Sequence, residues 1–254
     1  MASYRTLGVI PARYASTRFP GKALALLCGK PIVEWVWRQA KKARLLDDVW
    51  IATDDERIAA AARSFGAKAV MTSPDCPSGS DRIAEAARDV EVELIANIQG
   101  DEPLISPRTI DRAVQALLDD PSASVSTPRA PIGSREEFEN PNVVKVVTDR
   151  RGRALYFSRS PIPSLARAAV SDSAAAPPNV FKHPGFYVYR KAALLEFGGW
   201  PPTALEKIEK LEQLRYLEYG HSILVVDAAS DSIGVDTPED LARLASIFDP
   251  ERLP

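Results

Sequence analysis

Short apolar runs alternate with amphipathic stretches through the first half of the chain. The apolar runs have the length of buried strands and cover residues 6–10, 49–53, 69–72 and 94–98. The stretches with helical spacing cover residues 31–44, 55–65, 80–90 and 107–118. Strands that alternate with helices predict a mainly parallel sheet with helices on both faces, because each parallel connection has to cross over the sheet.

The pattern changes in the second half of the chain. Residues 143–148 and 153–157 alternate apolar and polar positions around a turn-like segment, which predicts a hairpin. Residues 164–179 lack apolar periodicity, so we interpret them as a mobile surface loop. The next elements expected are a strand, one long helix ended by Gly220, and a strand, over residues 185–189, 204–219 and 222–226.

The last helix has a clear start signal. Thr237 is suited to the N-cap, Pro238 to the first helical position, and Asp240 to the role that Glu usually has in a capping box. No linker separates two cores. We therefore predict a three-layer α/β/α fold with a mainly parallel central sheet. It forms one domain over residues 1–254, with a smaller β-containing lobe over residues 130–215.

Composition excludes several classes of protein. The 254 residues are 45% hydrophobic and 26% charged, as in globular proteins, and the net charge of −2 gives no reason to expect a nucleic-acid partner. Cys28 and Cys76 lie far apart without CxxC spacing, so we expect neither a disulfide framework nor a zinc site. The apolar run over residues 7–10 ends at Pro11, too short for a signal peptide or a membrane span. We expect a cytoplasmic protein without membrane insertion.

The loop over residues 11–22, PARYASTRFPGK, follows a buried strand. It therefore leaves the sheet at the carboxyl edge, where open α/β folds bind ligands. Arg13, Arg18 and Lys22 supply two guanidinium groups and an ammonium group, and Gly21 allows close approach of the backbone; a triphosphate needs all of these. The alternative is a solvated basic loop, and the spacing is not that of a Walker A loop. We favour phosphate binding.

Two acidic residues are expected at the same edge. Asp101, in QGDEP, follows the fourth strand, although a plain turn would also explain this segment. Asp236 precedes the last helix and could cap it, but Thr237 can already do so. Magnesium needs only one or two carboxylates in addition to substrate phosphates. The pair therefore indicates a Mg²⁺-assisted phosphoryl or nucleotidyl transfer site.

Eight segments in order along the chain resemble the 3-deoxy-manno-octulosonate cytidylyltransferase family, also called CMP-KDO synthetases. They are PARYASTRFPGK, TDDERI at 53–58, SGSDR at 78–82, QGDEP at 99–103, FSR at 157–159, HPGFYVYR at 183–190, LEKIEKLEQLR at 205–215 and GVDTPEDL at 234–241. The resemblance extends from residue 6 to about 245. The first loop alone would indicate only a sugar-nucleotide transferase, and the later segments are more specific.

The resemblance implies a reaction and a set of site residues. CMP would pass from CTP to the anomeric hydroxyl of 3-deoxy-D-manno-octulosonate (KDO), with Mg²⁺, giving CMP-KDO for lipopolysaccharide synthesis and pyrophosphate. A homodimer is also implied, with the smaller lobe completing the sugar pocket. The implied triphosphate-binding residues are Arg13, Ser16, Arg18 and Lys22, and those near the nucleotide are Ser78, Gly79 and Arg82. The implied metal ligands are Asp101 and Asp236, which with Arg18 and Lys22 form the catalytic set.

The resemblance also implies a sugar pocket. Its implied residues are Gln99, Arg159, His183, Tyr187, Glu212 and Gln213. Arg159 can bind the KDO carboxylate and the other side chains its hydroxyls, although surface, core or helix-pair roles would also explain several of them. Pro184, where the family often has Leu, removes a backbone donor beside His183. Cytidylyl transfer to 8-amino-KDO or sialic acid, and a non-catalytic nucleotide-binding homologue, remain alternatives.

Overall fold

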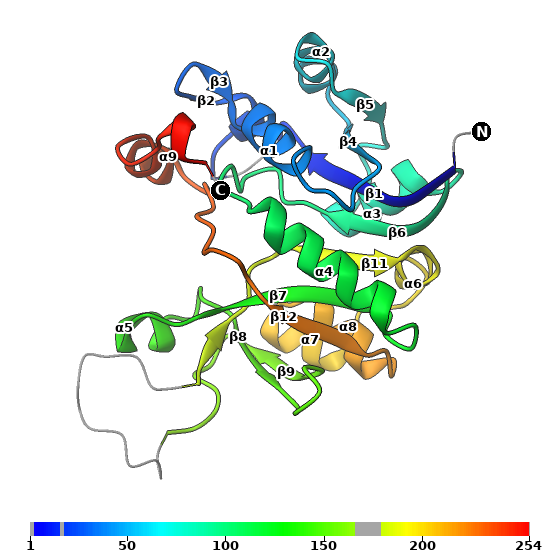
Figure 1. Cartoon of the computed structure of the whole chain (residues 1–254), viewed down its shortest axis with the longest axis vertical. Coiled ribbons are helices and arrows are strands. Elements are labelled where there is room, and N and C mark those ends of the chain that lie inside the picture. The colour runs from blue at the N-terminus through cyan, green and yellow to red at the C-terminus, as the bar shows by residue number, and fades with distance from the viewer. Residues whose placement is uncertain (1–2, 16–17, 166–178, 254) are drawn as a thin grey trace.

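Parallel strands form the first half of the central sheet. The computed structural model describes residues 3–15, 18–165 and 179–253. Four strands pair in parallel in the order β5-β4-β1-β6 (Figure 1): β1 (Ser3–Ala12), β4 (Asp48–Thr53), β5 (Lys68–Met71) and β6 (Glu91–Asn97). The helices of this half are α1 (Ile32–Ala40), α2 (Glu56–Ser64), α3 (Gly79–Ala87) and α4 (Pro107–Asp119). All eight predicted elements of this half are confirmed.

The second half joins the sheet mostly by antiparallel pairing. Its strands are β7 (Val125–Pro131), β8 (Lys145–Thr148), β9 (Ala154–Ser158), β10 (Phe181–Lys182), β11 (Tyr187–Arg190) and β12 (Ile223–Asp227). β11 lies antiparallel between β6 and β7, and β12 pairs with β7 in parallel. The predicted hairpin is β8 and β9. β7 was not predicted because Pro128 and Pro131 interrupt its pattern.

The predicted long helix over residues 204–219 is wrong, because two short helices replace it. They are α7 (Ala204–Glu209) and α8 (Gln213–Glu218), and Lys210 between them has a left-handed backbone with φ of 56°. This break lets Leu211 enter the core while Glu212 turns toward a pocket. Apolar spacing continues through the break, so periodicity alone could not reveal it. Gly220, with φ of 81°, follows α8 as predicted.

Two hydrophobic cores, one on each face of the sheet, define the three layers. Side chains of β1 alternate between them, so Val9 enters one core and Ile10 the other. The core that contains Ile10 also includes residues of α1, α2 and α4, whereas the core that contains Val9 includes residues of α3, α6 (Lys191–Phe197) and α8. The predicted three-layer α/β class is confirmed. None of the described helices is long and apolar enough to span a membrane.

Short elements complete the chain. They are η1 (Lys22–Leu24), β2 (Leu26–Leu27), β3 (Lys30–Pro31), α5 (Arg135–Glu139), α9 (Pro238–Ala245) and η2 (Pro250–Arg252). The predicted start of α9 is confirmed, since the Thr237 side chain accepts a bond from the Asp240 backbone in a capping box. Most of the predicted loop over residues 164–179 lies outside the described residues.

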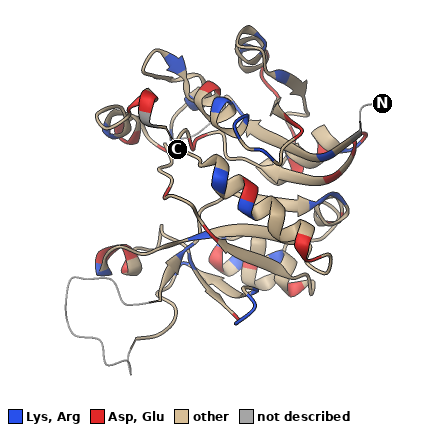
Figure 2. Cartoon of the chain, in the orientation of Figure 1, with Lys and Arg blue, Asp and Glu red and all other residues tan. Residues whose placement is uncertain are grey.

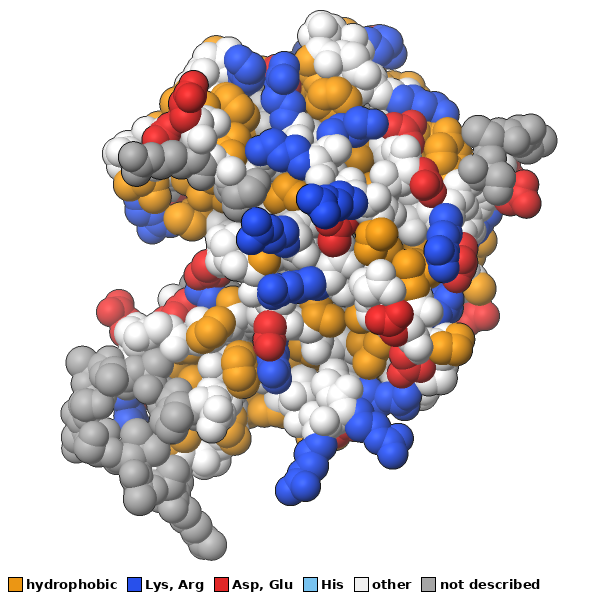
Figure 3. Space-filling model, viewed as in Figure 1, with side chains coloured by type: hydrophobic (Ala, Val, Ile, Leu, Met, Phe, Trp, Pro, Cys, Tyr) orange, Lys and Arg blue, Asp and Glu red, His pale blue; other side chains and the backbone are white. Residues whose placement is uncertain are grey.

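Charge is spread over the exterior of the molecule. Figure 2 shows acidic and basic residues on helices at both ends, while the ribbons of the central strands are mostly uncharged. On the face drawn in Figure 3, Lys and Arg side chains form a band through the middle, with Asp and Glu side chains beside them. Figure 1 shows β8, β9, α7 and α8 at the opposite end of the molecule from α1 and α2.

Candidate active site

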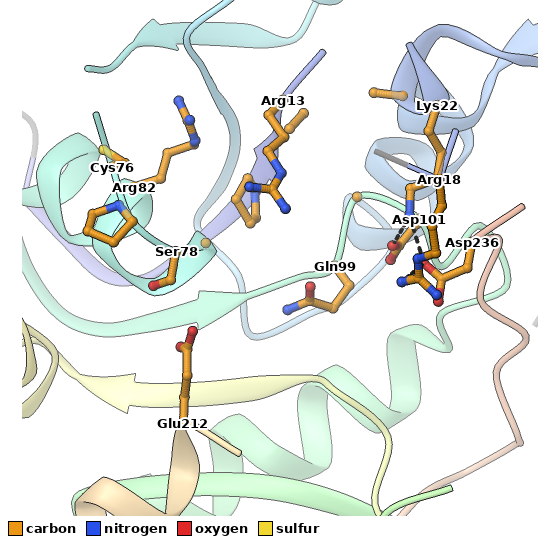
Figure 4. Close-up of a pocket in the computed structure, with 16 residues that line it drawn as sticks. Arg13, Arg18, Lys22, Cys76, Ser78, Arg82, Gln99, Asp101, Glu212 and Asp236 are labelled. Carbon is orange, nitrogen blue, oxygen red and sulfur yellow. Dashed lines mark hydrogen bonds and ion pairs between the residues drawn. The ribbon is translucent and has the colours of Figure 1, made fainter. Parts of the chain in front are cut away.

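A polar pocket of about 390 Å³ opens where β1 and β6 end (Figure 4). This is the carboxyl edge of the parallel strands, the location expected for a ligand site in an open α/β sheet. Most of the predicted residues line it: Arg13, Arg18, Lys22, Ser78, Gly79, Arg82, Gln99, Asp101, Glu212 and Asp236. Ser16 lies outside the described residues.

A second pocket, of about 400 Å³, adjoins the first. The two share part of their lining, namely Gly79, Gln99, Asp101, Glu212 and Asp236. Beyond this shared wall the lining of the second pocket includes the aromatic residues Tyr187, Tyr189, Phe197 and Tyr216. The site is therefore one cleft with a polar part and an aromatic part, and Asp101, Glu212 and Asp236 lie where they meet.

The Lys22 ammonium group lies between two carboxylates at this junction. Its Nζ is 2.5 Å from Asp101 Oδ2 and 3.1 Å from Asp236 Oδ1. Arg18 Nη2 also reaches Asp236 Oδ1, at 3.2 Å. The Val235 backbone N–H donates to the Asp101 carbonyl oxygen at 2.9 Å, so the two acid-bearing loops are held together. Both carboxylates thus face a single cation position.

The donor set at this position suits a hard divalent cation. Among the described residues, no group of three or more His, Cys, Asp and Glu side chains could hold a metal ion. Magnesium commonly uses only one or two carboxylates, however, and takes its other ligands from phosphates and water. The Lys22 ammonium marks a place where both carboxylates already accept a positive charge. Asp101 and Asp236 therefore fit Mg²⁺ bound together with a phosphorylated substrate.

A glycine brings the two strand ends together. A Cβ atom on Gly100 would lie 2.9 Å from the Pro11 carbonyl oxygen, closer than real contacts allow. Only glycine lets the chain after β6 approach the end of β1 this closely. Asp101, the next residue, is thereby placed within reach of Lys22.

Arg82 forms part of the opposite wall, and its side chain is fixed. The residue is only 4% exposed although it lines the polar pocket. Its Nη1 donates to Thr72 Oγ1 at 2.6 Å, and its Nη2 donates to Asp54 Oδ2 at 3.0 Å. Nearby, Ser78 caps α3 by accepting a hydrogen bond from the Asp81 backbone N–H. These contacts define the position of the pocket wall before any ligand binds.

Two residues beside the helix break reach the second pocket. Glu212 accepts a hydrogen bond from Ser80 Oγ at 3.1 Å, and burial raises the pKa of its carboxyl group. Gln213 lines the aromatic part, and its Nε2 is buried with no hydrogen-bond partner among the described residues. An unpaired buried donor costs about 1–3 kcal/mol. A ligand that offers an acceptor here would remove this cost.

Two predicted sugar-pocket residues, Arg159 and His183, do not line either pocket. The Arg159 guanidinium group donates to backbone carbonyls, including those of Glu209 at 2.8 Å and Pro141 at 3.2 Å. His183 is buried against Phe157 and Tyr187, and burial lowers its pKa to about 3. In this structure His183 is therefore buried and Arg159 is held by backbone carbonyls, although the resemblance implied that both contact the sugar.

The hydrogen bonds of His183 also define its tautomer. The Thr127 hydroxyl donates its one proton to the Phe186 carbonyl oxygen at 2.6 Å. At the 2.8 Å contact between Thr127 Oγ1 and His183 Nε2, the ring nitrogen must then be the donor. His183 is thus a neutral imidazole with its proton on Nε2, held within the wall.

Several lining residues were not found from the sequence. Glu102 lines the second pocket, and burial together with the neighbouring charge of Asp101 raises its pKa to about 7. Its position in QGDEP was the available signal, but the sequence does not show which side chains of this turn face inward. Asn97 and Tyr189 also line the second pocket from inside strands, where ordinary core residues have the same pattern.

Comparisons with known proteins agree on one class of enzyme. A family model described as cytidylyltransferase matches residues 7–223. A solved structure of CMP:2-keto-3-deoxy-manno-octonic acid synthetase complexed with CTP has a TM-score of 0.88 and 40% identity, covering 96% of this chain and 98% of that chain. A cytidylyltransferase structure from Leptospira borgpetersenii, 16% identical with a TM-score of 0.63, shares the fold. Fold and site thus define a nucleotidyltransferase of the cytidylyltransferase class.

Curated relatives narrow this class. The 3-deoxy-manno-octulosonate cytidylyltransferase of Syntrophotalea carbinolica is 52% identical over 238 residues, which are 93% of this chain and 95% of the relative. The enzyme of the same name from Geobacter sulfurreducens is 52% identical over 240 residues, 93% of this chain and 96% of the relative. The chain belongs to the 3-deoxy-manno-octulosonate cytidylyltransferase family.

Proposed function

We propose that this chain transfers CMP from CTP to the anomeric hydroxyl of KDO, releasing pyrophosphate and giving CMP-KDO for lipopolysaccharide synthesis. The observation that carries the proposal is the position of Lys22 between Asp101 and Asp236, at the junction of the polar and aromatic pockets. Nucleotide and sugar acid have to meet at one point, and this junction lies within both pockets. The names of the relatives supply the two substrates.

The polar pocket suits CTP. Arg13, Arg18 and Lys22 supply the positive charge for the triphosphate, with Ser16 from the same loop. The segment that includes Ser78, Gly79 and Arg82, together with Gln99, lines the part of the pocket available to ribose and base. CTP would thus extend from the Lys22 junction toward Arg82.

Asp101 and Asp236 are the carboxylates that would hold Mg²⁺. The metal would neutralise phosphate charge and lower the pKa of the attacking hydroxyl. Both carboxylates already share one cation, which supports this assignment. Asp236 also contacts Arg18, so the same carboxylate orients a guanidinium group of the triphosphate loop.

The side chains of the first loop would assist departure of pyrophosphate. The KDO hydroxyl gives up its proton to water, its oxygen forms a bond to the α-phosphorus, the bond from that phosphorus to the bridging oxygen breaks, and pyrophosphate leaves. Arg18 and Lys22 lie where they can neutralise the charge that develops on it. For this the Lys22 ammonium must exchange at least one carboxylate contact for a phosphate contact.

The aromatic pocket suits the sugar acid. Tyr187, Glu212 and Gln213 supply a hydroxyl, a carboxylate and an amide for the KDO hydroxyls. Arg159 would bind the KDO carboxylate only after giving up its bonds to backbone carbonyls. A homologue specific for 8-amino-KDO or sialic acid would keep the same metal site, so the sugar has to be tested directly.

Assembly and location complete the proposal. We include a homodimer formed through the lobe over residues 130–215, and a place in the cytoplasm. Leu155 and Ile208 support the dimer, because these apolar side chains of the lobe are 62% and 76% exposed. The mass of the purified protein in solution, measured by light scattering, tests it, and a monomer at micromolar concentration would refute it.

Pyrophosphate release tests the activity. Purified protein with Mg²⁺ is supplied with CTP, UTP, ATP or GTP, each combined with KDO, 8-amino-KDO or sialic acid. We expect release only with CTP and KDO. Release with CTP and another sugar would overturn the sugar assignment alone. CTP binding without release in any mixture would indicate a non-catalytic homologue.

A further inference from the structure

The segment TDDERI, at residues 53–58, contains two adjacent aspartates with different contacts. Asp55 caps α2 by accepting from the Arg57 backbone N–H at 2.9 Å, and its carboxylate also pairs with the Arg57 side chain. Asp54 instead accepts from Arg82 at 3.0 Å, across 28 positions of the chain. The helix cap therefore explains only one of the two carboxylates.

We propose that Asp54 is a positioning residue for the nucleotide. Together with Thr72 it fixes the Arg82 guanidinium group in the wall of the polar pocket, so that Arg82 donates to an uncharged acceptor of the nucleoside and not to the phosphates. This inference rests on CTP binding in the polar pocket, as proposed above.

The two anchors are held rigidly with respect to each other. Asp54 directly follows β4 and Thr72 directly follows β5, and these strands pair in parallel. The Thr72 backbone N–H donates to the Thr53 carbonyl oxygen at 2.9 Å, which continues the ladder beyond the strands. A planar guanidinium group bonded through both Nη atoms to such a frame has little freedom to turn.

The local charge favours an uncharged acceptor. The Asp54 carboxylate neutralises the Arg82 guanidinium group, and both side chains are largely buried, at 17% and 4% exposed. The pocket lining near them includes Cys76 and Pro77. Figure 4 shows Arg82 beside Ser78 and Cys76, on the other side of the pocket from Lys22 and Arg18. Phosphates would thus bind at the cationic side, leaving the nucleoside for Arg82.

Binding of CTP and of inorganic tripolyphosphate, measured by calorimetry with Mg²⁺, tests the inference. We expect Asp54→Asn to weaken CTP binding about tenfold, because the guanidinium group loses its charged anchor. Binding of tripolyphosphate should change less than about twofold, since it uses only the cationic side. Asp55→Asn is the matched control: it removes the same charge from the next residue, retains a side chain that caps helices well, and should leave CTP binding unchanged.

A double-mutant cycle with Arg82→Gln shows whether Asp54 acts through Arg82. If it does, Asp54→Asn should weaken CTP binding no further in the Arg82→Gln background. Thr72→Ser, which retains the hydroxyl, should bind CTP as the wild type does, whereas Thr72→Val should bind it more weakly. In the assay, the KM for CTP should rise in Asp54→Asn, while kcat and the KM for KDO stay within about twofold.

In folded protein, three results would overturn the inference. They are unchanged CTP affinity in folded Asp54→Asn protein, an equal loss for tripolyphosphate, and additive effects in the cycle. Circular dichroism and denaturant unfolding establish folding of each variant, and a loss of CTP binding confined to unfolded protein would also overturn it. If the wild-type protein does not bind CTP, the proposed function itself is refuted. That result differs from refutation of the Asp54 inference alone, in which the wild-type protein still binds CTP.

Discussion

The polar and aromatic pockets adjoin each other but are built in different ways. The polar pocket is formed mainly by segments that follow the parallel strands β1, β5 and β6, so most of these segments contribute neighbouring residues such as Gly100 and Asp101. The aromatic pocket combines side chains of β11 with residues around the break between α7 and α8. The functional side chains of the polar pocket thus lie mostly in short sequence motifs. Those of the aromatic pocket come from segments that are far apart in the sequence. We expect the effects of substitutions to differ between the two pockets as well.

The largest effect is expected at the junction of the two pockets. Asp101→Asn and Asp236→Asn should each lower kcat by about 10³-fold, because each removes one of the charges that would hold the metal and orient the loop cations. Pyrophosphate release at saturating Mg²⁺ measures this. Asp89→Asn, at an exposed position, is the control. Near-normal turnover in either variant would refute the metal assignment.

A large effect on stability is expected behind the aromatic pocket. Burial lowers the pKa of His183 to about 3, whereas the unfolded chain titrates near 6.5. The folded state is therefore favoured above pH 6.5, and this contribution is lost as the pH falls from 6.5 toward 3. The stability lost at pH 4, relative to pH 7, amounts to roughly 3 kcal/mol.

Denaturant unfolding between pH 7 and pH 4 tests this dependence. Compared with His183→Gln, the wild type should lose stability more steeply below pH 6.5. His221→Gln, at the second histidine, whose side chain is 23% exposed, should keep the steep wild-type slope. Equal slopes for the wild type and His183→Gln would show that the buried ring is not the source.

A smaller effect, with opposite signs for folding and binding, is expected inside the aromatic pocket. Gln213→Met removes the buried Nε2 donor and should raise the free energy of unfolding by about 1 kcal/mol. The same change should raise the KM for KDO about tenfold and leave the KM for CTP unchanged, because Gln213 lines only the second pocket. Gln115→Met, on the exposed face of α4, should alter neither KM. A rise in the KM for CTP would contradict the separation of the two pockets.

The smallest effect is expected at the helix break. Lys210 has a left-handed backbone, so Lys210→Gly should increase stability by about 0.5–1 kcal/mol. Lys207→Gly, inside α7, should decrease stability by about 1 kcal/mol. Thermal unfolding distinguishes the two signs, and destabilisation by both variants would mean that the Lys210 side chain contributes more than its backbone strain costs.

The same division explains what could be predicted from the sequence. Lys22, Asp101 and Asp236 were predicted because each follows or precedes a recognisable element, and the order of parallel strands determines which ends meet. Lys210 and β7 could not be predicted, since tertiary contacts override the local pattern at both places. Arg159 has the right chemistry for a sugar acid, but hydrogen bonds to backbone carbonyls, which a sequence does not display, direct its side chain elsewhere.

The antiparallel insertion of β11 has a consequence for how this part of the chain tolerates length changes. Tyr187 is paired with Asn97 of β6, and Tyr187 and Tyr189 face one side of the sheet while Val188 enters the core on the other. A deletion or insertion of one residue that shifts the register of the whole strand would reverse all three side chains and put valine where the aromatic wall now stands. The spacing of this segment thus determines the lining of the second pocket as much as the identity of its tyrosines does.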